Sequence, residues 1–189
     1  MIFERCAPFV RLSALGILAI ASVGLSQAAP PQQQETNAKK RQESELVRIV
    51  RESTVRFRDP AAAEAEGYQL MFGCVSGPDA GAMGLHYVSM SLVGAGVLDA
   101  TRPQIVIYEP LPNGRKRLIG ADYLLLADAW NKKNVGPPQL MGQLFHLIEA
   151  PNRYGLPAFY TLHVWAWKDS PTGMFVNWNH NVSCDAFEG

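Results

Sequence analysis

Between residues 41 and 58, apolar or small side chains recur every three to four positions, and charged side chains occupy the remaining faces. The recurring positions are Val47, Val50, Thr54 and Phe57. This pattern predicts an amphipathic helix. Asp59 and Pro60 then supply an N-cap and a first-turn proline for a short second helix that ends at Gly67.

Beyond Gly67 the pattern changes to short runs of aliphatic and aromatic residues, separated by Gly, Pro and Asn. These runs predict strands over Tyr68–Val75, Leu85–Met90, Gln104–Tyr108, Leu118–Leu126, Leu140–Glu149 and Ala158–Trp167. Most intervals are too short for the helical crossovers that parallel strands need. We therefore expect an α+β protein with two N-terminal helices followed by a largely antiparallel, strongly curved sheet or partial barrel.

Asn113-Gly114 is a strong signal for a tight hairpin. A two-residue turn there would place Ile105 opposite Asp122 and Glu109 opposite Leu118. The two acids would then share one face of the sheet but lie about 13 Å apart along it. Such a separation would hardly allow them to bind one ion together.

The first 28 residues have the layout of a secretory signal, with Arg5 and Arg11, an apolar run over 12–25 and small residues before a cleavage point after Ala28. The apolar run has about 14 residues, short of the roughly 20 that span a bilayer. The Pro- and Gln-rich range 29–40 predicts a flexible tether, and 41–189 predicts a single domain. We expect a secreted or periplasmic protein.

Removal of this signal would leave two cysteines, Cys74 and Cys184, in an oxidising compartment. A disulfide between them is the leading interpretation, and two free thiols or thiolate ligands are the alternatives. The full chain has 17 Lys and Arg against 17 Asp and Glu. This balance gives no electrostatic reason to expect nucleic acid or a membrane as partner, and the sequence does not indicate the oligomeric state.

Three histidines lie within the predicted strands, on faces where the alternate residues are apolar. His86 shares a face with Val88 and Met90, and the other two are His146 and His163. Three neutral imidazoles that meet in a dry cavity, completed by a carboxylate or water, would bind a divalent transition metal such as Zn, Cu, Fe or Mn. Each could instead be a core histidine that donates to a carbonyl group.

Glu109 and Asp122 are the candidate carboxylates, either to complete the metal site or to work as acid or base with a histidine. Aromatic residues that could line a ligand pocket are Tyr87, Tyr160, Trp165 and Trp167. The leading hypothesis is therefore a protein with a His-lined small-molecule pocket, which binds a divalent transition metal there and acts as a metal-dependent enzyme. The alternative is a non-enzymatic periplasmic binding module for an apolar or aromatic ligand, and the sequence leaves the question of catalysis open.

Four segments occur together in the chain: MGLHYV, IYEP followed by GADYL, YTLHVWAW, and WNHNVSC. With this combination the chain, from about Gly67 onward, resembles a functionally uncharacterised group of secreted bacterial proteins of similar length. The resemblance implies a secreted single-domain protein, and it implies no activity, cofactor or site.

Overall fold

The computed structural model describes residues 31–188, so the predicted signal peptide lies outside the described residues. The first described element is the long helix α1 (Pro31–Thr54), followed by a 3₁₀ turn, η1 (Val55–Arg58), and the short helix α2 (Pro60–Ala65). Asp59 caps α2 as predicted, because its side chain accepts a hydrogen bond from the Ala61 backbone N–H.

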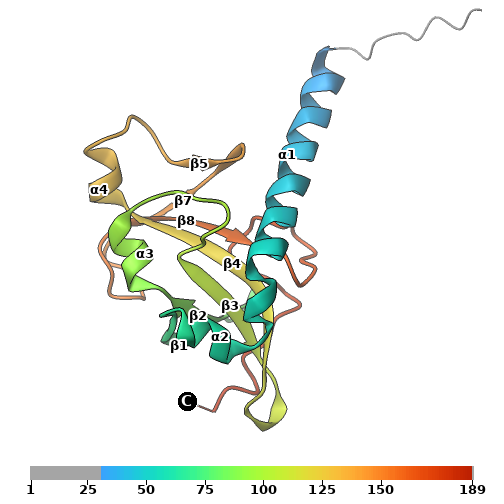
Figure 1. The fold of residues 1–189 in the computed structure, drawn as a ribbon, viewed down its shortest axis with the longest axis vertical. Coiled ribbons are helices and arrows are strands. Elements are labelled where there is room, and N and C mark those ends of the chain that lie inside the picture. The colour runs from blue at the N-terminus through green and yellow to red at the C-terminus, as the bar shows by residue number, and fades with distance from the viewer. Residues whose placement is uncertain (1–30, 189) are drawn as a thin grey trace, which may run out of the picture.

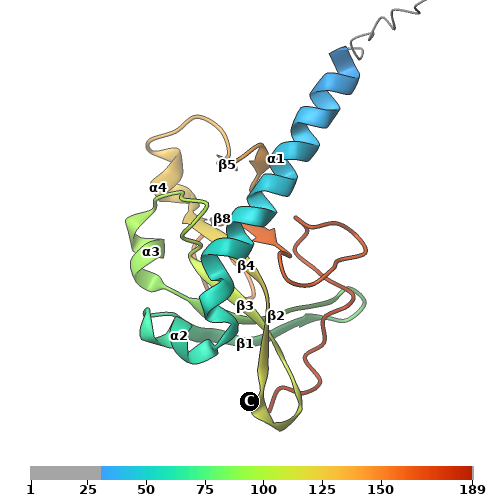
Figure 2. The ribbon, with the colours of Figure 1, turned by 45° about the vertical axis from the view of Figure 1, so that its right-hand side comes forward.

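Helix α1 begins at Pro31, within the range predicted as a tether. The residues of this range include Gln, Glu, Ala and Lys, which favour helices, and proline is well suited to a first helical turn. The first turns of α1 extend beyond the sheet, whereas its last turns lie across it (Figures 1 and 2). Leu46, Val47 and Val50 are the side chains that α1 buries there.

Six strands form one antiparallel sheet in the order β1-β2-β3-β4-β8-β7. The sheet is curled into half a barrel, which confirms the predicted α+β class with an antiparallel, curved sheet. The bounds are β1 (Gln69–Gly77), β2 (Gly81–Val88), β3 (Ile105–Pro110), β4 (Lys116–Leu126), β7 (His146–Ile148) and β8 (Phe159–Val164). A second, two-stranded sheet pairs β5 (Gln139–Leu140) with β6 (Gln143–Leu144).

Three short helical segments connect the strands. Helix α3 (Met90–Ala95) follows β2, the 3₁₀ turn η2 (Pro112–Gly114) joins β3 to β4, and α4 (Ala127–Asn131) follows β4. No helix among residues 31–188 is long and apolar enough to cross a membrane.

The β3–β4 hairpin keeps only part of the predicted register. Ile105 pairs with Asp122 as predicted, but Glu109 pairs with Arg117 rather than Leu118. A register shift next to Ile107 causes the difference, since an extra residue on one strand displaces all pairs beyond it.

The two faces of the sheet are covered differently. Helix α1 packs on one face, against Ala121, Tyr123 and Leu125 of β4. On the opposite face, the apolar cluster includes Leu124 and is completed by partly buried residues from the loop after β7 and from the C-terminal segment. This second face carries the polar site described below.

A disulfide joins Cys74 of β1 to Cys184 of the C-terminal segment, across 110 residues, and confirms the predicted pairing. It holds the C-terminal segment against the edge strand β1. Such a bond is typical of proteins that fold in an oxidising compartment.

Candidate metal centre

A buried histidine, aspartate and second histidine meet on the sheet face opposite α1. His86 lies on β2, Asp122 on β4 and His163 on β8. Each offers one ligand atom, and these atoms all lie within 4.8 Å of one another. The described residues therefore contain a group whose geometry can hold a metal ion.

The curl of the sheet brings these side chains together. Asp122 and His163 are direct partners across β4 and β8. His86, however, is separated from β8 by three strand spacings, about 14 Å on a flat sheet. Its ring centroid nevertheless lies 5.7 Å from that of His163, because both rings point into the concave side.

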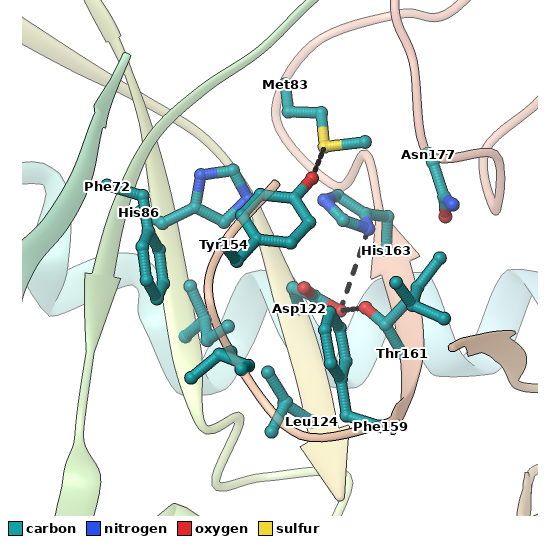
Figure 3. A pocket seen from close by; sticks show the side chains of 13 residues that line it. Phe72, Met83, His86, Asp122, Leu124, Tyr154, Phe159, Thr161, His163 and Asn177 are labelled. Atoms are coloured by element: carbon teal, nitrogen blue, oxygen red, sulfur yellow. Dashed lines mark hydrogen bonds and ion pairs between the residues drawn. The ribbon is translucent and has the colours of Figure 1, made fainter. Parts of the chain in front are cut away.

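The three residues line a small cavity of about 30 Å³, and space of roughly 10–15 Å³ is enough for one water molecule. Its other walls are mostly aliphatic and aromatic (Figure 3). The remaining lining residues are Phe72, Met83, Ile105, Leu124, Ile148, Tyr154, Leu156, Phe159, Thr161 and Asn177. An ion with one small additional ligand would fill this space.

Asp122 is held by neutral donors. The Thr161 hydroxyl donates to Oδ1 at 2.6 Å, and the Leu162 backbone N–H donates to the same oxygen at 3.1 Å. Burial raises the pKa of Asp122 to about 6, and these hydrogen bonds and the nearby His86 only partly oppose the shift. At neutral pH, this site therefore holds a carboxylate that no lysine or arginine compensates.

His86 has a defined orientation. Its Nδ1 lies 3.2 Å from the carbonyl oxygen of Gly84, two residues earlier on β2. Gly84 has φ +91°, a conformation that favours glycine, and this bend directs its carbonyl group toward the ring. An Nδ1–H that donates to this carbonyl leaves the Nε2 lone pair free for a metal.

His163 is buried without hydrogen-bond partners. Neither ring nitrogen has one among the described residues, and Nδ1 lies 3.7 Å from Asp122 Oδ1, too far for a hydrogen bond. Burial lowers the pKa of His163 to about 3 and that of His86 to about 4. Because the His163 ring is uncharged at neutral pH, it does not form a salt bridge with the ionised Asp122.

The third predicted histidine does not join this group. His146 pairs with Thr161 but its side chain is exposed, so the prediction that it is buried is wrong. It belongs to β7, a three-residue strand at the edge of the sheet. Apolar alternation cannot show that a strand lies at an edge, where a side chain on the inner face can still reach solvent.

Glu109, the other predicted carboxylate, lies outside the cavity. It is buried, but Lys168 contacts its Oε1 at 2.6 Å and Arg117 contacts its Oε2 at 2.5 Å. Burial alone would raise the pKa of Glu109, but the hydrogen bonds from Lys168 and Arg117 hold it below its usual value. Two cationic side chains of the protein therefore pair with this carboxylate.

Four aromatic residues were predicted to line a ligand pocket. None of them is among the described residues that line the cavity. Trp165 donates to the Val176 carbonyl, Trp167 to the Thr54 hydroxyl and Tyr160 to the Asn131 side chain. Tyr87 stacks edge-on against Tyr108 in the cluster beneath α2. Each therefore has a structural contact away from the cavity.

Sequence reasoning identified only His86, Asp122 and His163 among the cavity residues, and those it missed include Phe72, Met83, Tyr154 and Asn177. Tyr154 and Asn177 lie in loops, and loop residues carry no periodic signal. Phe72 lies in a β1 bulge with φ 69°, which is unusual for a bulky residue and redirects its side chain. Only the Gly73 that follows it hints at this bend.

No family model matches the chain, and no curated protein or solved structure shows significant similarity to it. The geometry of the site is thus the basis for a functional proposal.

Proposed function

We propose that the protein is a secreted or periplasmic metal-binding protein that holds one divalent transition metal through His86, Asp122 and His163. The observation that carries this proposal is the state of His163, whose two ring nitrogens are buried without a partner. A buried polar group left unsatisfied costs about 1–3 kcal/mol. A bound metal would satisfy one of these nitrogens.

The donor set suits such an ion. Two imidazoles and one carboxylate bind Zn, Fe, Cu or Mn in proteins. Metal ligands must be deprotonated, and the lowered pKa values of His86 and His163 keep both rings neutral throughout the physiological range. The negative charge of Asp122 would offset part of the charge of the ion.

Three protein ligands are typical of catalytic rather than structural zinc sites, because they leave a coordination position for water or substrate. The open position would lie in the cavity, beside its apolar walls. We therefore extend the proposal to a metal-dependent enzyme, in which the ion polarises an oxygen of the substrate or activates a water molecule.

Metal analysis of protein purified without an affinity tag tests the proposal. We expect stoichiometric metal, or its recovery when Zn, Cu, Mn or Fe is added to the metal-free protein. His163→Ala should abolish tight binding. His180→Ala is the matched control, because His180 is exposed and lies outside the metal-ligating group. Absence of metal under both conditions would overturn the proposal.

A non-enzymatic module for a small apolar ligand is the second candidate, and the apolar walls of the same cavity, about 30 Å³ in volume, favour it. Native mass spectrometry of the purified protein separates the two functions. A retained organic ligand in metal-free protein would favour the binding module, and a mass increase equal to one metal ion would favour the metal site.

A further inference from the structure

Tyr154 brings a hydroxyl group into the wall of the metal cavity (Figure 3). The Tyr154 hydroxyl donates to the Met83 sulfur at 3.5 Å, and a thioether is only a weak acceptor. The O–H group therefore keeps most of its capacity to donate to a stronger acceptor within the cavity.

The position of Tyr154 is fixed by its surroundings. Asn152 Oδ1 accepts hydrogen bonds from the backbone N–H groups of Tyr154 and Leu156, at 3.2 and 3.3 Å. The ring packs edge-on between Phe72 and Phe159, with centroid distances of 5.5 and 5.9 Å. Such a phenol is a pre-oriented donor rather than a mobile surface group.

Charge limits what can occupy the open coordination position. A divalent ion with two neutral imidazoles and one carboxylate leaves a net charge of about +1 in a cavity with apolar walls. An uncompensated buried charge is unfavourable. A small anion in the open position would neutralise it and would accept a hydrogen bond from Tyr154.

A second polar group lies in the same cavity wall. Asn177 Oδ1 is buried and has no partner among the described residues. It is an acceptor and would complement an O–H or N–H group of a bound ligand. Tyr154 and Asn177 thus offer one donor and one acceptor beside the metal ligands.

We infer that Tyr154 is a positioning residue that donates a hydrogen bond to a small anionic ligand in the open coordination position of the metal. The inference rests on the proposed function. The space of about 30 Å³ suits a ligand of a few atoms, such as hydroxide or a small oxygen- or nitrogen-donor anion.

Azide binding to the Cu(II)-loaded protein tests the inference, with the ligand-to-metal absorption band as readout. A hydrogen bond to a charged group contributes about 1.5–3 kcal/mol, so the azide Kd of Tyr154→Phe should rise at least about tenfold. Copper affinity should stay unchanged. Tyr160→Phe is the matched control, because the Tyr160 hydroxyl contacts Asn131 outside the cavity.

The outcomes separate the two proposals. Copper binding with equal azide affinity in wild type and Tyr154→Phe would overturn the role of Tyr154 and leave the metal site standing. Failure of the wild-type protein to bind any metal would overturn the proposed function and this inference with it. Thermal unfolding of both variants establishes that they are folded.

Discussion

Two buried carboxylates on neighbouring strands have opposite environments. Glu109 on β3 contacts Lys168 and Arg117, and its pKa lies below the usual value although burial alone would raise it. Asp122 on β4 receives hydrogen bonds only from neutral donors, and burial raises its pKa to about 6. The side chains of the two acids are similarly buried, at 7% and 3% exposed, so burial does not distinguish them.

The partners of each carboxylate indicate whether its role is structural or functional. A buried charge is normally paired, because its desolvation is otherwise uncompensated. Glu109 is paired by the chain itself and stabilises the contact between the hairpin and the C-terminal region. Asp122 is beside two neutral imidazoles instead, so no side chain of the described residues neutralises its charge. An external cation bound to these three groups would do so.

The largest expected difference between the two acids is in metal affinity. Asp122→Asn removes the charged ligand of the proposed site and should weaken binding by at least about 100-fold, since loss of even outer-shell partners costs 10–100-fold. Glu109→Gln should bind metal as the wild type does. Competition with a chromophoric chelator measures both constants. Equal losses in the two variants would contradict the distinction drawn here.

The next difference is in the pH dependence of stability of the metal-free protein. The pKa of Asp122 rises from 3.8 to about 6 on folding, so its contribution to stability falls as pH increases through that window. One pKa unit corresponds to about 1.4 kcal/mol, which gives a cost on the order of 3 kcal/mol above pH 6. Asp122→Asn should therefore gain stability relative to wild type between pH 5 and 7.5.

Glu109 should show the opposite sign. Its folded pKa is lowered, so its contribution is present above the ordinary value of 4.5 and is lost as pH falls through the folded value. The deficit of Glu109→Gln should shrink on acidification. Urea unfolding at several pH values measures both trends, and a flat difference for Asp122→Asn would show that its carboxylate is compensated in the metal-free protein.

Local alternation in the sequence was enough to predict much of this site. It placed His86 and His163 on faces that prove to be buried, and the turn at Asn113-Gly114 predicted that Ile105 lies opposite Asp122. The cysteine count predicted the disulfide. The features of the strands and the hairpin depend on residues that are close in the sequence. The disulfide was predictable because the chain without its predicted signal has two cysteines and therefore one possible pairing.

What could not be predicted depends on contacts between distant segments. The choice of Asp122 over Glu109 follows from Lys168, which lies 59 residues after Glu109. The exposure of His146 follows from the position of β7 at the sheet edge. The entry of Tyr154 into the cavity follows from a loop without periodicity. The pattern of hydrophobic residues in the sequence indicates none of these contacts.

The smallest expected effects concern the two cations of Glu109. The side chain of Lys168 is 19% exposed and that of Arg117 is 56% exposed. Solvent screens exposed ion pairs, which contribute about 0–1 kcal/mol, whereas removal of a buried partner costs more. Lys168→Met should therefore lower the free energy of unfolding by about 1–2 kcal/mol, and Arg117→Met by less than about 1 kcal/mol.

Double-mutant cycles with Glu109→Gln isolate each pair from other effects of the substitution. The coupling energy should be larger for Lys168 than for Arg117, and that of Arg117 should fall further in high salt. Both single variants should retain wild-type metal affinity, because neither cation lines the cavity. A change in metal affinity in either variant would mean that the Glu109 network and the metal site are coupled, and that the structural and functional roles of the two carboxylates are not separate.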